Sequence, residues 1–448
     1  MHAAERGHTV YIGAFPNLFR RSLKPGIFHE KSITPKKDRI KELMFFRENN
    51  FICTSQDEES GLLNKDFVKE FALTRFSKET LNLVFRQFSW GDYDESLMKK
   101  TFPMFANKIV KTGSPRADLW RKDLSSYYDN KKIQEYKDLI LISSNFYSLV
   151  SKEPIHSAIE FERNAGYFDR GGEEIERLHY EVHAFNTLTL MHYIFAIRRL
   201  SKNYPHASIV VRPHPTESLD SWRALLGEIK NVYVVREGGI GAWVKYAKVV
   251  IHNGCTTGLE AKVMGKHVVA YKPLPSPSEY GLPSYKVSTE IIREEDLIKV
   301  VGDILKKGSI EKNDNKELEA NKLISSMFYN LDGRLAVENI VEEWEKVKNA
   351  SELSQKNNNI KLRVISLGLL FIHMVGTIKL KLKRFLYLFK GPSKKTPPIN
   401  KEKFPKFHNK EIEDLIVNFQ RGLNRFHNQR FTIISSKMIV LKRNDYKS

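Results

Sequence analysis

Residues 251–260 have the residue types best suited to holding an anionic ligand. They read Ile-His-Asn-Gly-Cys-Thr-Thr-Gly-Leu-Glu, which predicts a buried strand, a glycine- and threonine-rich turn and the start of a helix. Free peptide N–H groups at a helix start can hold phosphate, and threonine hydroxyls add donors. Glu260, one turn into the helix, is placed to accept hydrogen bonds from a ribose. The candidate binding residues in this stretch are His252, Asn253, Gly254, Thr256, Thr257 and Glu260.

The same stretch also has a purely structural interpretation. Thr257 and Glu260 are spaced as in a capping box, in which the two side chains satisfy the helix-end donors without any ligand. We favour phosphate binding because a second polar motif follows another predicted strand.

That second motif spans residues 211–217 and reads Val-Arg-Pro-His-Pro-Thr-Glu. Its two prolines restrict the backbone around His214, which suggests that the direction of this side chain matters. Arg212 offers a planar fork of donors for phosphate, and His214 can donate to an oxygen or shuttle a proton. An isolated loop histidine is more often a satisfied surface residue. Beside the 251–260 motif, however, we predict that Arg212, His214 and Glu217 belong to one site.

Two further loops follow predicted strands. Residues 236–243, Arg-Glu-Gly-Gly-Ile-Gly-Ala-Trp, either read a nucleobase through backbone groups, with Gly239 as the contact, or form a flexible turn with Trp243 in the core. Residues 273–281 are rich in proline and serine and form either a rim over a sugar or a plain connector.

A cluster of carboxylates follows a predicted strand nearer the N-terminus. Asp57, Glu58 and Glu59 could supply the base that an enzyme needs to deprotonate a hydroxyl. Acidic clusters are usually solvated faces, but a position directly after a strand favours a catalytic role. We therefore predict that Asp57, Glu58, Glu59 and His214 are catalytic.

The elements that position these motifs alternate between strand and helix. Continuous apolar strands alternating with helices predict an α/β fold whose parallel sheet is covered on both faces. The strands are predicted at 139–142, 208–211, 232–235, 249–251 and 267–271, and the helices at 174–200, 219–229, 240–246 and 257–264.

The N-terminal region shows the same alternation less regularly. Strands are predicted at 50–53 and 108–112, and helices at 66–76 and 78–85. Residues 6–8, Arg-Gly-His, predict a helix end, and residues 9–13 a short buried strand. An α/β domain should place a strand before that helix, so we expect the chain to lack its first strand.

These patterns predict three parts. Residues 1–130 form one Rossmann-like domain, residues 138–348 a second Rossmann-like domain, and residues 350–448 a basic, partly apolar helical extension, with a solvated linker at 127–137. Residues 361–410 contain 13 Lys and Arg against the single acidic Glu402. This segment either packs on the other domains or contacts an anionic membrane surface. Its apolar run, Val364–Ile378, is shorter than the roughly 20 residues that span a bilayer.

The motifs together resemble a bacterial family of surface carbohydrate biosynthesis proteins, which are relatives of capsule Kdo transferases and of glycerophosphate polymer transferases. The family has the GT-B fold, in which two Rossmann-like domains face a cleft. The matching stretches are residues 6–8, 25–32, 57–61, 90–91, 113–118, 212–215, 252–254 and 403–405.

The resemblance implies a metal-independent glycosyltransferase that moves a sugar from a nucleotide-sugar donor, CMP- or UDP-linked, to a glycan or lipid-linked acceptor of a capsule, O-antigen or similar surface polymer. In related enzymes a His-Pro pair and a Ser/Thr-rich helix start hold the donor phosphate, which corresponds to His214, Pro215, Thr256 and Thr257. This chain has His-Asn-Gly-Cys where a Ser-Ser pair is usual. Two alternatives stay open: a nucleotide-sugar 2-epimerase, and an inactive GT-B scaffold.

Composition fits this picture. The formal net charge of +20 favours an anionic partner, but no nucleic-acid-binding motif accompanies it, so nucleic acid is not expected. The two cysteines, Cys53 and Cys255, lie far apart and predict neither a disulfide framework nor a zinc site. We expect no bound cofactor or metal. We also expect a cytoplasmic location, with a peripheral contact at the inner face of the membrane if residues 361–410 bind that surface rather than pack on the other domains.

Overall fold

The computed structural model describes residues 1–13, 18, 24–59, 75–146, 150, 155–164, 168, 172–276, 282–309, 314–347 and 406–444. Contacts within the chain divide it into two compact units. Unit 1 comprises Met1–Gln56, Ser77–Gln87 and Val337–Ser448, and unit 2 comprises Asp57–Phe76 and Phe88–Ala336.

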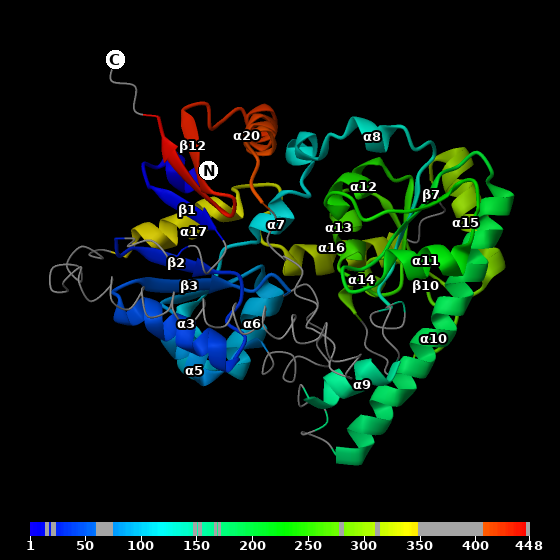
Figure 1. Ribbon diagram of the computed structural model, residues 1–448, viewed down its shortest axis with the longest axis horizontal. Coiled ribbons are helices and arrows are strands. Elements are labelled where there is room, and N and C mark those ends of the chain that lie inside the picture. Colours follow the sequence, from blue (N-terminus) through cyan, green and yellow to red (C-terminus); the bar gives the residue numbers. More distant parts are fainter. Residues whose placement is uncertain are drawn as a thin grey trace, which may run out of the picture. The chain divides into compact units, whose positions relative to one another are not determined.

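Unit 2 is built around a parallel six-stranded sheet (Figure 1). Each pair of neighbouring strands in it is parallel, and its spatial order is β11-β10-β9-β6-β7-β8. Numbered along the chain from β6, this is the 3-2-1-4-5-6 order of a Rossmann fold. The strands are β6 (Ile140–Ser143), β7 (Ile209–Arg212), β8 (Val232–Val234), β9 (Val249–His252), β10 (His267–Tyr271) and β11 (Thr289–Ile291).

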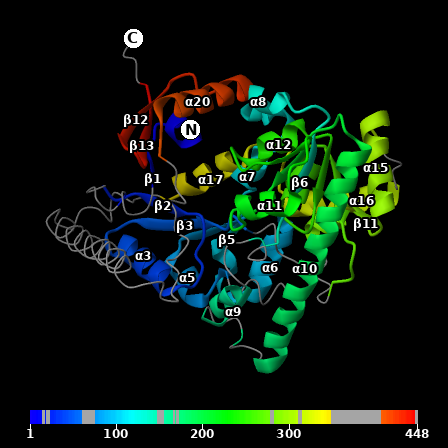
Figure 2. The same cartoon turned by 45° about the vertical axis from the view of Figure 1, so that its right-hand side comes forward.

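Alternate strand residues pack against helices on opposite faces of this sheet, as the pleat requires. Ile140 and Ile142 belong to one core cluster with α10, α11 and α15, whereas Leu141 packs with α8, α12 and α13. Figure 2 shows α12 and α10 on either side of β6. Within the described residues, the helices of unit 2 are α6 (Asp92–Thr101), α7 (Pro115–Asp118), α8 (Lys131–Gln134), α9 (Ile155–Asn164), α10 (Gly172–Asn203), α11 (Leu219–Leu226), α12 (Ile240–Tyr246), α13 (Thr257–Val263), α14 (Pro283–Lys286), α15 (Glu294–Lys307) and α16 (Asp314–Met327), with 3-10 segments η2 (Pro103–Lys108) and η3 (Lys122–Tyr128).

A four-stranded sheet has the order β2-β3-β4-β5, and its β2 and β3 pair in parallel. Its strands are β2 (Ile27–Glu30), β3 (Ile52–Gln56), β4 (Arg86–Ser89) and β5 (Ile109–Lys111). In unit 1, α3 (Lys37–Glu48) packs beside this sheet, where the rings of Phe28 and Phe46 stack with centroids 3.7 Å apart. The α5 helix (Lys78–Leu83) is closed by a capping box between Ser77 and Thr80.

The remaining part of unit 1 is an antiparallel sheet in the order β1-β13-β12. The β12-β13 hairpin and α20 appear in red and orange in Figure 1. Ala4 of α1 and Ile412 of α20 pack in one cluster with Ile439 and Leu441 of β13. The elements are α1 (His2–Glu5), β1 (Val10–Gly13), α17 (Ala336–Glu345, starting at the unit boundary), α20 (Asn409–Leu423), β12 (Gln429–Ser435) and β13 (Met438–Arg443).

The predicted α/β class is confirmed, and each strand predicted between 139 and 271 is present within one or two residues. Three local predictions were wrong. The strand at Val10–Gly13 is not buried but pairs antiparallel with β13 and exposes Tyr11 and Ile12. The expected linker contains α8, whose Ile133 is buried, and the C-terminal extension ends in a hairpin rather than only helix.

Other predictions are not tested by the described residues. The three domain ranges and the cleft between domains stay predictions. The expected helix at 66–76 falls almost entirely outside the described residues, as do the apolar run 364–378 and most of the basic segment 361–410. Among the helices that the structure describes, none has the length and apolar character needed to cross a membrane.

Candidate functional site at the sheet switch point

The strand order of unit 2 reverses between β6 and β9, which are hydrogen-bonded neighbours. In open parallel sheets, ligands bind beyond the carboxyl ends of the strands at such a switch point. Ser143, the last residue of β6, pairs with Arg212 of β7 on one side and with His252 of β9 on the other. The structure therefore brings the two main predicted motifs to the same edge of one sheet.

His252 shapes the turn that follows β9. Its side chain is fully buried; Nδ1 accepts from the Gly254 N–H at 3.0 Å, and Nε2 lies 2.9 Å from the Ser288 hydroxyl. Because that hydroxyl donates to the Ser284 carbonyl, it accepts from His252, so the ring is neutral with its proton on Nε2. Burial lowers the pKa of His252 to about 4. The ring therefore holds the turn in shape.

This neutral histidine predicts a dependence of stability on acid. Its pKa is near 4 when folded but near 6.5 when unfolded, so the unfolded state binds more protons between these values. We expect the free energy of unfolding to fall by roughly 3 kcal/mol between pH 6.5 and pH 4 on account of His252. Urea titrations across this pH range should show a smaller loss of unfolding free energy for His252→Gln than for the wild type. The control variant His206→Gln, which replaces an exposed histidine, should show the same slope of unfolding free energy against pH as the wild type. Equal slopes for all three proteins would contradict this role.

The start of α13 has donors without acceptors. Thr256 is the N-cap residue but makes no side-chain cap, and the Glu260 N–H bonds to the Thr256 carbonyl, so the capping box that was the alternative interpretation does not form. Among the described residues, the peptide N–H groups of Cys255, Thr256 and Thr257 have no acceptor. Helix α13 has only seven residues, so its dipole is small. The turn would therefore hold a ligand mainly through these three N–H groups.

Side chains from β6 fix this turn in place. The Ser143 hydroxyl donates to Thr257 Oγ1 at 3.1 Å and lies 3.4 Å from the sulfur of Cys255. Because Thr257 accepts this bond, its own hydroxyl proton is directed elsewhere, and the described residues supply no acceptor for it. The Asn253 amide donates to the Asn145 carbonyl at 3.1 Å. The Oδ1 atoms of Asn145 and Asn253 are buried and have no donor among the described residues, which leaves two acceptors beside the free N–H groups.

Glu217 links the loops after β6 and β7. Its buried carboxylate accepts from the Ser144 hydroxyl at 2.5 Å and the Phe146 N–H at 2.5 Å, both in the β6 loop. It also accepts from the His214 N–H at 3.2 Å and from Trp222 Nε1 at 2.8 Å. Since all four bonds are internal to the protein, Glu217 positions the loop that carries His214.

His214 is half-buried in this loop. Its Nδ1 accepts from the Thr216 N–H at 3.3 Å and lies 2.8 Å from the Thr216 hydroxyl, which places the proton of the neutral ring on Nε2. Burial lowers the pKa of His214, while the carboxylates of Glu217 and Glu59 work in the opposite direction. Arg236 donates to the His214 carbonyl at 3.1 Å and also to the Glu217 carbonyl. His214 is thus a neutral N–H donor at neutral pH.

Arg212 holds the loop that contains Gly239. Its guanidinium donates to the carbonyls of Glu237 at 2.7 Å and Gly238 at 2.8 Å, and Trp243 Nε1 donates to the Glu237 carbonyl at 2.9 Å. Burial is the main reason that the pKa of Arg212 falls to about 10, which leaves it charged at neutral pH. Trp243 is buried in the core, which agrees with one of the two interpretations left open for this loop. Arg212 therefore stabilises the turn at Glu237 and Gly238, and its positive charge is buried beneath this loop.

Glu260 is a buried carboxyl group, and neither of its oxygens has a hydrogen-bond partner among the described residues. Burial raises its pKa to about 7, against the influence of the Arg116 cation. A Cβ at Gly241 would lie 2.8 Å from Glu260 Oε1 and 2.4 Å from the Tyr128 ring. Glycine is therefore required for α12 to approach this carboxyl group so closely.

Arg116 is a site residue that the sequence interpretation did not single out. It lies in the Gly-Ser-Pro-Arg-Ala-Asp stretch, where Ser114 caps α7 by accepting from the Ala117 N–H at 3.3 Å, and its guanidinium lies over the Trp120 ring. Its guanidinium also donates a long hydrogen bond of 3.5 Å to the Glu58 carbonyl. The Ser114 cap and Pro115 fix the start of α7, and the half-buried guanidinium of Arg116 acts electrostatically on Glu260. The resemblance of this motif to the family was the signal that could have identified it.

The acidic cluster also belongs to unit 2. Asp57 is buried in a two-bond ion pair with Arg75, at 2.9 and 3.0 Å, and accepts from the Glu59 N–H at 2.8 Å. Burial raises the pKa of Asp57 although Arg75 opposes the rise. Glu59 pairs with Arg75 at 2.9 Å but keeps 56% of its side chain exposed. Asp57 thus anchors the loop, and Glu59 is its more accessible carboxylate.

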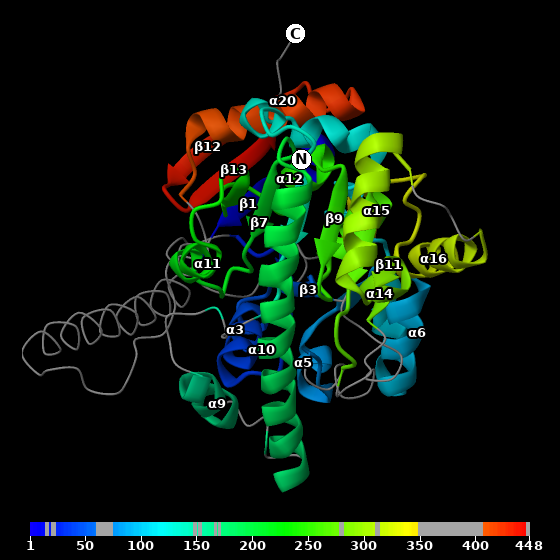
Figure 3. The same cartoon turned by 90° about the vertical axis from the view of Figure 1, so that its right-hand side faces the viewer.

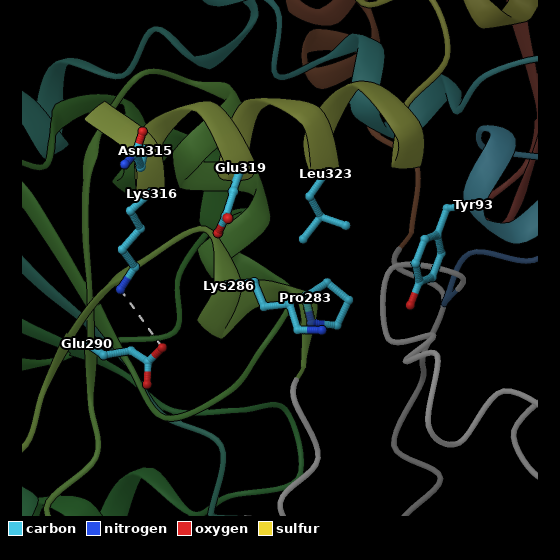
Figure 4. A pocket seen from close by; sticks show the side chains of 8 residues that line it. All are labelled: Tyr93, Pro283, Lys286, Glu290, Asn315, Lys316, Glu319 and Leu323. Carbon is cyan, nitrogen blue, oxygen red and sulfur yellow. Dashed lines mark ion pairs between the residues drawn. The ribbon is translucent and has the colours of Figure 1, made fainter. Parts of the chain in front are cut away.

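A cavity of about 550 Å³ lies elsewhere in unit 2, and none of the predicted site residues lines it. Figure 4 shows the Tyr93 ring at one end and the Lys316–Glu290 ion pair, 3.9 Å between N and O, at the other. Pro283 and Lys286 of α14 line it, whereas their neighbour Tyr285 stacks on His252. The cavity is therefore separated from the switch-point turn by the short helix α14.

Comparisons with known proteins give similarity of structure but not of sequence. No family model matches the chain, and neither does any curated protein. A UDP-GlcNAc 2-epimerase from Neisseria meningitidis, solved with UDP-GlcNAc, is 15% identical with a TM-score of 0.41, covering 71% of this chain and 76% of that one. A UDP-GlcNAc 2-epimerase from Methanocaldococcus jannaschii, in complex with UDP-GlcNAc and UDP, is 13% identical with a TM-score of 0.43, covering 74% and 78%.

The wall teichoic acid polymerase TagF is also similar, at 12% identity and a TM-score of 0.42, covering 69% of each chain. Because each of these TM-scores is below 0.5, we take the function of this chain from its own residues.

Proposed function

We propose that unit 2 binds a nucleotide sugar at the carboxyl edge of its six-stranded sheet and that the protein transfers the sugar to a growing surface glycan. The observation that carries the binding proposal is the set of free donors at the switch point. The N–H groups of Cys255, Thr256 and Thr257 and the Thr257 hydroxyl lack acceptors among the described residues. A phosphate offers oxygens that can accept all of these donors at once.

The surrounding residues suit the other parts of such a donor. The unpaired Glu260 carboxyl can accept from ribose hydroxyls, and the Arg116 cation beside it favours a negatively charged ligand. The turn at Glu237–Gly239, held by Arg212, exposes backbone groups that a base can meet. His214, with its proton on Nε2, can donate to a phosphate oxygen as negative charge develops there.

The transfer step needs a base for the acceptor. The acceptor oxygen forms a bond to the anomeric carbon of the sugar, the bond from that carbon to the phosphate oxygen breaks, and the acceptor proton passes to the base. Asp57 and Glu59 both pair with Arg75, but Asp57 is buried, whereas the side chain of Glu59 is 56% exposed and interacts electrostatically with His214. We therefore assign the base to Glu59. The surface glycan as acceptor follows from the family resemblance of the motifs.

A ligand screen with matched variants tests this proposal. A nucleotide sugar among CMP-, UDP-, GDP- and CDP-linked compounds should raise the melting temperature of the full-length chain. Thr257→Val should weaken binding of that compound roughly ten-fold or more, because a hydroxyl donor to a charged phosphate is lost. Thr101→Val should bind normally, because among the described residues the Thr101 hydroxyl bonds to Leu97 of its own helix. If no nucleotide sugar binds, or both variants bind alike, the proposed site is wrong.

Turnover assays then separate transfer from its alternative. Release of free nucleotide that requires a glycan acceptor supports a transferase, and Glu59→Gln should reduce kcat with little change in donor affinity. Conversion of the nucleotide sugar to an epimer without any acceptor would assign the protein to the epimerases instead.

A further inference from the structure

The 32-residue helix α10 has two faces of different character. One face is in the core of unit 2, where Tyr193, Ile197 and Leu200 are buried. Figure 3 shows α10 standing in front of the sheet, beside α15. The opposite face carries a row of exposed apolar residues, which we call the α10 stripe: Tyr180, Ala184, Leu188, Met191 and Phe195.

The spacing of the α10 stripe is that of a helix interface. At 100° per residue its five members fall within an arc of roughly 80°, on the side away from the core. Leu188 is 57% exposed and Phe195 is 61% exposed. Single exposed apolar residues are ordinary, but a continuous row of them at this spacing marks a surface that binds another protein.

We propose that the α10 stripe joins two copies of this chain, with their α10 helices antiparallel about a twofold axis. The stripe is symmetric about its own centre. In the sequence, the pair Tyr180 and Phe195 and the pair Ala184 and Met191 have the same midpoint. This midpoint lies between Thr187 and Leu188. An axis at that midpoint sets the Tyr180 ring against Phe195 of the second copy, and small Ala184 against large Met191. Leu188 then lies close to its own counterpart, as a self-complementary twofold interface requires.

Charge along the helix selects the antiparallel direction. The N-terminal half carries Glu173, Glu174, Glu176 and Glu181 against one cation, Arg177, which pairs with Glu181 at 3.2 Å. The C-terminal half carries Arg198, Arg199 and Lys202 and no acidic residue. Parallel helices would put like charges together, whereas antiparallel ones oppose them, with Glu173 facing Lys202. The acidic half also disfavours an anionic membrane as the occupant.

The mass of the full-length chain in solution tests this inference independently of the proposed function. Sedimentation and light scattering should give twice the 52.0 kDa of one chain, with dissociation on dilution. Leu188→Glu, which brings two carboxylates together at the axis, should weaken self-association by about 100-fold or more. Leu318→Glu on α16, a leucine that is 53% exposed, should leave self-association unchanged. A monomer at every concentration, or equal effects of the two variants, overturns the proposal.

A charge exchange tests the antiparallel register. Lys202→Glu should weaken the dimer several-fold, and adding Glu173→Lys to it should restore the association. A double variant no better than the single one overturns the register. Binding to anionic vesicles that Leu188→Glu abolishes in a monomeric chain would assign the stripe to a lipid surface and would also overturn the proposal.

Discussion

Replacing Glu217 with alanine is expected to lower the free energy of unfolding by about 3–5 kcal/mol. The change removes the acceptor of four donors, namely the Ser144 hydroxyl, the Phe146 and His214 N–H groups and Trp222 Nε1. Within the described part of the chain, the Ser144 hydroxyl keeps only its 3.4 Å bond to the Arg212 carbonyl. Each unpaired buried donor costs part of its desolvation energy. Urea unfolding of the wild type and the variant measures this loss directly.

Glu228 provides the matched control for this prediction. Glu217 lies just before helix α11 and Glu228 just after it, but Glu228 is exposed. Glu228→Ala should change the free energy of unfolding by less than about 0.5 kcal/mol. If Glu217→Ala were equally mild, the carboxylate would not be what joins the β6 and β7 loops, and the position of His214 would need another explanation.

Replacing Gly254 with alanine is expected to destabilise unit 2 by about 3 kcal/mol and to weaken nucleotide-sugar binding at least ten-fold. Gly254 has φ of +94°, a left-handed conformation that side chains disfavour, and a Cβ there would lie 2.5 Å from the Tyr285 hydroxyl. Since Tyr285 stacks on His252, relieving the clash would move the turn that presents the Thr256 and Thr257 N–H groups.

The control variant Gly265→Ala separates the energetic cost of a left-handed backbone from the cost of a steric clash. Gly265 follows the other end of α13 with φ of +71°, and a Cβ there would meet nothing within 4 Å. Gly265→Ala should therefore cost only about 1–2 kcal/mol, for the left-handed conformation, and should leave ligand affinity unchanged. Equal losses of affinity for both variants, measured by calorimetric titration, would show that the turn after β9 is not the binding element.

The sheet of unit 2 could be predicted because its strands are buried on both faces and therefore read as continuous apolar runs. The strand from Val249 and the strand ending at Arg212 were found for this reason, and their parallel direction placed both polar motifs at one edge. The neighbouring β6, which completes the switch point with Ser143 and Asn145, was predicted as a strand. Its role in holding the turn was not, because a single serine after a strand carries no signal of its own.

The partners of the charged residues could not be predicted, because they come from distant parts of the chain. Arg212 and Glu217 were expected to face a ligand, but they bind carbonyl, hydroxyl and N–H groups of neighbouring loops. Asp57 is likewise paired with Arg75 rather than free. A motif predicts that polar groups gather at a site, but only the fold shows which of them position it and which, like Glu260 and Thr257, have capacity left for a ligand.

The exposed strand at the N-terminus shows the same limit. Residues 9–13 have the apolar character of a core strand, and nothing local indicates that they pair with residues 438–441 more than 400 positions away. β1 is an edge strand that pairs only with β13 in this sheet, and its neighbours Tyr11 and Ile12, which point to opposite faces, are both exposed.

Hydrogen–deuterium exchange of the full-length chain, with and without the nucleotide sugar that raises its melting temperature most, locates the binding element directly. The free N–H groups of Cys255, Thr256 and Thr257 should exchange much more slowly when the phosphate accepts their hydrogen bonds. Protection confined to residues 283–290 and 315–323 around the cavity of Figure 4, with none in the turn after β9, would contradict a donor site at the switch point.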